Sequence, residues 1–156
     1  MQTATAEKHL EKILDEDVFF RGMKEEHLRS IVASGTLVRF EAGEVIFEEG
    51  EPAHRCYVMR TGRVALQLVS YRTEPLTLVT LDAGNLIGWS WLFPPYRWKF
   101  TAQALEVTRA ISLDGDSLRA KCEQDHDLGY ELMKRFAAVI DKRIEALSTH
   151  LVEVER

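Results

Sequence analysis

The sequence predicts a mainly β fold, an antiparallel sandwich or barrel with helices at both ends. Between Thr36 and Leu113, strand-sized apolar runs recur and are separated by glycine turns. The segments on either side follow the i, i+3, i+4 spacing of helices instead. Because no helical pattern interrupts the strand region, a doubly wound sheet of alternating strands and helices is excluded.

The length and composition favour a single structural domain. The chain has 156 residues and 46% apolar content, which is enough to bury one substantial core. We divide it into N-terminal helices at residues 1–35, a β core at residues 36–114 and C-terminal helices at residues 115–156.

Two short helices are expected before the β core. After a break at residues 20–22, the second helix repeats the apolar spacing of the first. The apolar positions are Leu10, Ile13 and Leu14 in the first helix and Leu28, Ile31 and Val32 in the second. Gly35 is placed to end the second helix.

The β core is expected to consist of runs rich in Val, Ile, Leu, Phe and Tyr, with turns at four glycines. The turns are predicted at Gly43, Gly50, Gly62 and Gly84. The predicted strands are Leu37–Phe40, Val45–Phe47, Tyr57–Met59, Val64–Val69, Leu76–Leu81, Phe100–Leu105 and Ala110–Leu113.

The last segment predicts a short helix and then a long one. Asp114 and Asp116 offer N-caps for a helix through Ser117–Lys121. In the helix that follows, apolar residues alternate at spacings of four and three, which is the heptad pattern of helices that pair. This seam consists of Met133, Ala137, Ile140, Ile144, Leu147, Leu151 and Val154. We expect it to form a homodimer interface; the alternative is that it packs only on the chain's own β core.

Charge and cysteine content limit the function classes. The net charge of −5 and the absence of a basic cluster argue against direct nucleic-acid binding. Two cysteines without a CxxC pair predict neither a disulfide framework nor a zinc site. No run of 18 apolar residues is present, so we expect a cytoplasmic protein that does not enter the membrane.

The stretch from Asp82 to Leu105 is where a ligand site is expected. It contains all three tryptophans and six aromatic residues within twelve positions, and Arg97 and Lys99 are its only charged residues after Asp82. Amides near its glycines would suit a phosphate, and its aromatic rings would suit a flat ligand. The alternative is that the glycines only shape turns and the aromatic side chains fill the core.

The spacing of eight residues resembles the first half of a cyclic-nucleotide-binding domain of the Crp/Fnr-like, catabolite activator protein-like class. These residues are Phe40, Gly43, Ile46, Gly50, Tyr57, Val58, Gly62 and Val64. The resemblance implies an eight-stranded jelly roll, or double-stranded β-helix, at residues 36–114. It also implies a long C-terminal dimerisation helix and a regulatory role in signalling without catalysis.

The family's phosphate-binding cassette is a glycine-bounded turn and short helix, with a Glu for the ribose hydroxyl and an Arg for the cyclic phosphate. Residues 84–88 resemble its opening and residues 101–106 the strand that follows. At the Glu position stands Trp89, and alignment back from Thr101 without gaps places Trp98 at the Arg position. The resemblance therefore implies these candidate ligand-binding residues: Gly84, Asn85, Gly88, Trp89, Ser90, Arg97, Trp98, Lys99, Thr101 and Ala102.

We interpret the sequence as a ligand-sensing regulatory module whose ligand is a cyclic nucleotide or another small molecule. The alternative is a ligand-free scaffold for dimerisation or for a protein partner. Regulators of the family carry a helix-turn-helix domain after the long helix, and this chain stops at Arg156, so we expect no direct DNA binding.

Two further classes are weighed, and neither leads to an assigned catalytic or metal-binding residue. A cupin-like metalloenzyme needs two histidines and a carboxylate on adjacent strands, and only His54 of the five histidines lies in the strand region. A haem or redox sensor would use Cys56, which is also well explained as a small buried apolar residue. No metal and no certain cofactor is expected.

Overall fold

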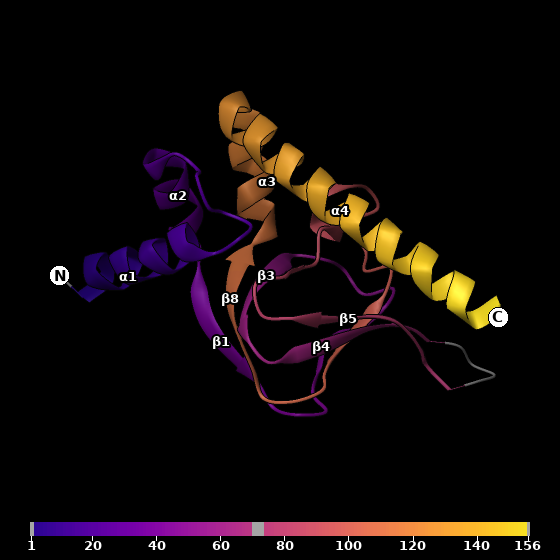
Figure 1. Cartoon of the computed structure of the whole chain (residues 1–156). Coiled ribbons are helices and arrows are strands. Elements are labelled where there is room, and N and C mark those ends of the chain that lie inside the picture. The colour runs from indigo at the N-terminus through magenta and orange to yellow at the C-terminus, as the bar shows by residue number, and fades with distance from the viewer. Residues whose placement is uncertain (1, 70–73, 156) are drawn as a thin grey trace.

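The computed structural model describes residues 2–69 and 74–155, and it shows two antiparallel sheets packed together with helices at both chain ends (Figure 1). One sheet has the strand order β1-β8-β3-β6 and the other β2-β7-β4-β5. The strands are β1 (Thr36–Phe40), β2 (Val45–Phe47), β3 (Arg55–Thr61), β4 (Arg63–Leu68), β5 (Leu76–Asp82), β6 (Leu86–Ile87), β7 (Thr101–Ala104) and β8 (Thr108–Asp114). This mainly β jelly roll with flanking helices confirms the predicted fold class.

Strand β6 was missing from the sequence prediction. It consists of only Leu86 and Ile87, which pair with Val58 and Tyr57 of β3. A run of two residues between glycines carries no periodic signal, so the prediction included them in a turn. Their burial places the start of the glycine-bounded turn inside the core.

The helices are α1 (Gln2–Glu16), α2 (Glu25–Val32), α3 (Gly115–Gln124) and α4 (His126–Glu155), with a short 3-10 helix η1 (Ser90–Leu92) before β7. The Asp114 side chain accepts a hydrogen bond of 2.9 Å from the backbone N–H of Ser117, as its predicted N-cap role requires.

The prediction that Gly35 ends the second helix is wrong. Helix α2 ends at Val32, and Ala33 is its C-cap. A Cβ atom at Gly35 would lie 3.3 Å from the Leu113 side chain. The glycine therefore lets the chain pass close to β8 rather than terminating a helix.

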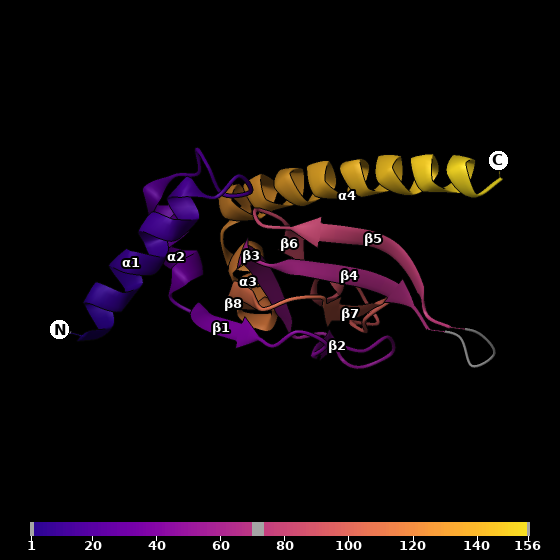
Figure 2. The same cartoon turned by 60° about the horizontal axis from the view of Figure 1, so that its bottom comes forward.

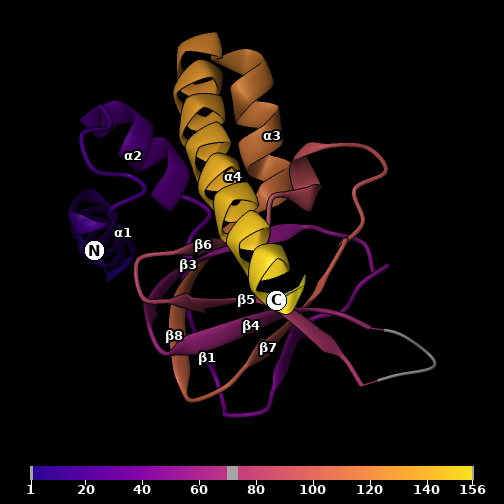
Figure 3. The ribbon, with the colours of Figure 1, turned by 45° about the vertical axis from the view of Figure 1, so that its right-hand side comes forward.

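Helix α4 crosses the side of the sandwich formed by β5 and β6 (Figure 2), and α3 packs beside its N-terminal half (Figure 3). The Phe136 ring of α4 lies 5.1 Å from the Phe19 ring and 5.6 Å from the Trp91 ring, both edge to face. These contacts join α4 to the segment after α1 and to η1, so the aromatic segment and the long helix share one core.

No helix in the described parts of the chain combines the length and apolarity needed to cross a membrane.

Candidate ligand-binding site

The Trp98 ring lies flat on the Phe47 ring of β2. The two ring centroids are 3.8 Å apart and the planes differ by 11°, and Trp98 is only 6% exposed. Its backbone N–H donates to the Glu51 carbonyl at 2.9 Å, and its carbonyl accepts from the Gly50 N–H at 2.7 Å. The turn that follows β2 therefore fixes Trp98 in the interior.

The same ring lies against the glycine-bounded turn. Gly88 has φ of +92°, and a Cβ atom there would lie 2.7 Å from two carbons of the Trp98 ring. Glycine is required at this position because other residues disfavour this backbone conformation and because the ring occupies the space of any side chain.

The cavity left around this ring is small. We call it the Trp98 pocket; it has a volume of about 30 Å³, and its wall consists of Phe47, Leu66, Gly88, Trp89, Ser90, Trp98, Lys99, Phe100 and Arg143. One water molecule occupies roughly 30 Å³ in the liquid, whereas ligand pockets usually span roughly 300–1,000 Å³. In this arrangement the pocket has room for about one water molecule.

The structure brings together half of the residues proposed from the sequence. Gly88, Trp89, Ser90, Trp98 and Lys99 all line the Trp98 pocket. Phe47, Leu66, Phe100 and Arg143 also line it and were missed. They come from β2, β4, the residue before β7 and α4, so only the folding of distant segments reveals them.

Arg97, Thr101 and Ala102, three of the proposed residues, do not line the Trp98 pocket. Arg97 is exposed and donates a hydrogen bond of 2.8 Å to the Gly50 carbonyl. The Thr101 hydroxyl accepts a hydrogen bond of 3.0 Å from the Glu49 N–H. Ala102 is buried opposite Phe47 in the β2–β7 pair.

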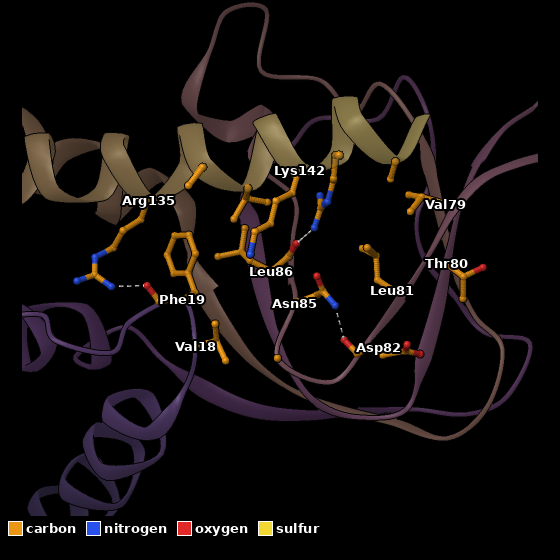
Figure 4. Close-up of a pocket in the computed structure, with 15 residues that line it drawn as sticks. Val18, Phe19, Val79, Thr80, Leu81, Asp82, Asn85, Leu86, Arg135 and Lys142 are labelled. Atoms are coloured by element: carbon orange, nitrogen blue, oxygen red, sulfur yellow. Dashed lines mark hydrogen bonds between the residues drawn. The ribbon is translucent and has the colours of Figure 1, made fainter. Parts of the chain in front are cut away.

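Gly84 and Asn85 line a different pocket, which lies between α4 and the turn that joins β5 to β6 (Figure 4). We call it the turn pocket; its volume is about 420 Å³. The Asn85 amide donates to the Asp82 carbonyl at 3.0 Å, and Arg135 donates to the Phe19 carbonyl at 2.6 Å. The Asn85 and Arg135 side chains therefore hold the walls of this pocket together.

Arg143 of α4 is the functional candidate that sequence reasoning missed. Its side chain donates a hydrogen bond to the Leu86 carbonyl, and its guanidinium carbon lies 4.6 Å from the centre of the Trp89 ring. Only 9% of the residue is exposed, and within residues 2–69 and 74–155 it forms no ion pair with a carboxylate. Burial lowers the pKa of Arg143 to about 10, so the side chain is still charged at neutral pH.

A third cavity lies beside Arg143, between α4 and the sheet. We call it the α4 cavity; its volume is about 180 Å³, and its wall consists of Leu66, Leu78, Val79, Trp89, Phe100, Ile140, Arg143, Ile144 and Leu147. All of these side chains except Arg143 are apolar or aromatic. The α4 cavity is therefore an apolar space with one charged group in its wall.

The heptad seam of α4 lies beside the face that packs on the core. Leu128, Leu132 and Phe136 are buried, whereas Ile144 is 58% exposed and Leu151 is 63% exposed. Ala137 is also exposed, and Met133, Ile140 and Leu147 are half-buried. The side chain of Val154 lies outside the described residues. The described part of the seam is thus an apolar stripe that the chain itself covers only in part.

The residues weighed for metal or haem binding are not arranged as a metal site. Cys56 is fully buried, and burial raises the pKa of its thiol, which disfavours the thiolate that binds metals. His54 is exposed, and its Nδ1 lies 2.9 Å from a carboxylate oxygen of Asp116. Among the residues that the structure describes, no three His, Cys, Asp or Glu side chains are grouped so as to hold a metal.

A jelly roll with a glycine-bounded turn beneath a long C-terminal helix defines a class of ligand-sensing regulatory domains. The family model "Cyclic nucleotide-binding domain" matches residues 37–125, which is more than half of the chain. The chain belongs to the cyclic nucleotide-binding domain family, and the resemblance seen in the sequence is confirmed.

The chain is also similar to a transcriptional regulator. The chain is 22% identical over 145 residues to a CRP-like cAMP-activated global transcriptional regulator of Mycobacterium tuberculosis, with coverage of 93% of this chain and 63% of the relative. It therefore spans less than two thirds of the length of that regulator.

Solved structures agree on the fold. A Geobacter metallireducens protein assigned to the cyclic nucleotide-binding class is 28% identical with a TM-score of 0.78, covering 85% of this chain and 96% of that one. The sensor domain of the transcriptional regulator DNR of Pseudomonas aeruginosa is 19% identical with a TM-score of 0.72, covering 90% of this chain and 94% of that one. Because the identity to the DNR sensor domain is only 19%, that similarity shows the fold alone.

Replacing Gly88 with alanine tests the contact with Trp98. We expect Gly88→Ala to reduce the free energy of unfolding by about 2–4 kcal/mol, because the backbone strain of roughly 1–2 kcal/mol is added to the overlap with the ring. Gly43→Ala is the matched control, since its φ is +88° and a Cβ atom there meets nothing within 4 Å. Urea unfolding measures both.

In the wild-type background, Gly88→Ala should lower the free energy of unfolding more than Gly43→Ala does. This difference should vanish in a Trp98→Leu background, because the shorter side chain no longer contacts residue 88. Equal costs at the two glycines in the native background would show that the Trp98 ring does not lie against Gly88.

Proposed function

We propose that this chain is a homodimeric, non-catalytic regulatory module that senses a ligand other than cAMP or cGMP. The observation that carries the proposal is the Trp98 ring, which stacks on Phe47 against Gly88 and reduces the cavity to about 30 Å³. A nucleotide would have to displace a tryptophan that is packed on both sides, and large aromatic side chains contribute about 3–5 kcal/mol to a core.

The two charged groups that bind a cyclic nucleotide in the family are not in place in this chain. Trp89 stands where the family has a carboxylate for the ribose, and the Arg97 guanidinium is turned to the Gly50 carbonyl. Each lost charge-assisted contact is worth roughly 1.5–3 kcal/mol, and two of them weaken binding by about two to four orders of magnitude.

The exposed seam of α4 supports the dimer. Ile144 and Leu151 are each more than half exposed in the single chain, in line with the half-buried Ile140 and Leu147. A contiguous apolar stripe on a long helix is usually covered by another subunit, and a second copy of the same helix is the partner that the heptad spacing fits.

A ligand-free dimerisation scaffold or a docking module for another protein is the second candidate, and the nearly filled Trp98 pocket favours it. For either role we propose a cytoplasmic location, supported by the similarity to a transcriptional regulator. The net charge of −5 supports the proposal that this chain does not bind DNA directly.

Titration with cyclic nucleotides tests the ligand proposal. Isothermal titration calorimetry should show no saturable heat for cAMP or cGMP below about 100 μM, because the two charge-assisted contacts and the open pocket are both lost. Micromolar saturation that disappears in Arg97→Ala would show that Arg97 binds the phosphate, and the proposal would then be wrong.

Light scattering tests the dimer. The wild-type chain should have the mass of a dimer at roughly tens of micromolar, and Ile144→Glu should be monomeric because it places a charge in the middle of the apolar seam. Thr149→Glu is the matched control, since it adds the same charge to an exposed position of α4 outside the seam, and it should remain a dimer. A monomeric wild type, or equal effects of the two variants, would contradict the proposed interface.

A further inference from the structure

Arg143 is a buried cation that no carboxylate neutralises within residues 2–69 and 74–155. Its described contacts are the Leu86 carbonyl and the face of the Trp89 ring, both of which are uncharged. Proteins rarely bury a charge without a partner of opposite charge, because removing the charge from water is costly. A carboxylate partner is absent from the ion pairs of the described residues. Arg143 is therefore suited to receive an anion from outside the chain.

The surroundings of Arg143 restrict what the anion can be. Arg143 forms part of the wall of the α4 cavity, whose other side chains are all apolar or aromatic. A guanidinium has five N–H donors, and one nitrogen is engaged with Leu86. The donors that are left match the two oxygens of a carboxylate. A sugar or a base needs several hydrogen-bond partners, and besides Arg143 only the indole N–H of Trp89 could supply one from the side chains of this wall.

Size and shape favour a compact, flat ligand. The volume of about 180 Å³ is below the usual range for nucleotide-sized ligands. Trp89 and Phe100 place two aromatic side chains in the wall, and aromatic rings pack well with flat rings. Fixed aromatic walls of this kind would contact a planar ring more fully than a flexible chain, which also loses more conformational freedom on binding.

The geometry points to a binding site for a small aromatic carboxylate in the α4 cavity, with its ring against Trp89 and Phe100 and its carboxylate on Arg143. This inference rests on the proposed sensing function and names the chemical class of its ligand. It also gives the signal a route, because Ile140, Ile144 and Leu147 belong both to the cavity wall and to the proposed dimer seam. A ligand in the cavity would bear directly on the surface that pairs with the second subunit.

Calorimetric titration of the whole chain with naphthoate and its neutral isostere naphthamide tests the site. We expect naphthoate to saturate at roughly tens of micromolar and to bind about tenfold more tightly than naphthamide, because only the acid forms charge-assisted hydrogen bonds. Octanoate, an aliphatic carboxylate, should bind more weakly than naphthoate.

Three variants locate the site. Arg143→Met should abolish the preference for the acid, and Leu78→Trp should block naphthoate by filling the cavity while leaving Arg143 in place. Lys142→Met removes the neighbouring cation, which does not line this cavity, and should bind as the wild type does. Circular dichroism and a cooperative thermal transition check that each variant is folded. If Arg143→Met does not fold, the naphthoate affinity of Leu78→Trp still tests the location of the site.

Several results would overturn the inference. For the wild type, these are no saturation by naphthoate below about 1 mM, or equal affinity for naphthoate and naphthamide. For the variants, they are unchanged naphthoate binding in a folded Leu78→Trp, a preference for naphthoate over naphthamide that survives in a folded Arg143→Met, or a loss of naphthoate binding in Lys142→Met. Octanoate binding as tightly as naphthoate would overturn the aromatic assignment. None of these results bears on the proposed dimer. Micromolar cAMP binding would overturn the proposed function whether or not naphthoate binds.

Discussion

The stack of Trp98 on Phe47 is the contact on which the rest of this structure depends. It joins the segment before β7 to β2, and the two backbone hydrogen bonds of Trp98 to Gly50 and Glu51 hold the ring in place. Because the ring also lies against Gly88, it sets the position of the glycine-bounded turn. One side chain thus completes the core in the region that the sequence resemblance assigns to the phosphate-binding cassette.

Helix α4 links this core to the part of the molecule that a second subunit would contact. Phe136 anchors its first half in the aromatic core, and Arg143 ties its middle to the carbonyl of Leu86 in β6. The cost of burying that guanidinium is only partly offset by an uncharged carbonyl and an aromatic face. An external anion bound to Arg143 would offset the rest of this desolvation cost. Because Arg143 belongs to α4, binding of that anion would also favour one position of the helix.

Much of the fold could be predicted from the sequence, because strand-sized apolar runs, glycine turns and the helical spacing of apolar residues are local signals. The candidate site could be predicted only in part. Gly88, Trp89 and Trp98 lie in one conspicuous stretch, but the stacking partner Phe47 and the cation Arg143 are far from it in the chain and become neighbours only through the folded sheets. In the sequence Arg143 is one of several charged residues around a heptad seam, and no spacing rule distinguishes a buried arginine from exposed ones. Gly35 and β6 were misread for the same reason, since tertiary contacts with β8 and β3 determine them.

Native mass spectrometry of the protein taken directly from cells tests most directly whether the family's nucleotide pocket has been replaced. The measurement records the subunit number and any retained small molecule together, without a choice of ligand in advance. We expect a dimer that carries no cyclic nucleotide and that is either bare or bound to an adduct with the mass of a small aromatic carboxylic acid. A stoichiometric adduct with the mass of cAMP or cGMP would contradict it, because the Trp98 ring would then have to leave the place that Phe47 and Gly88 give it.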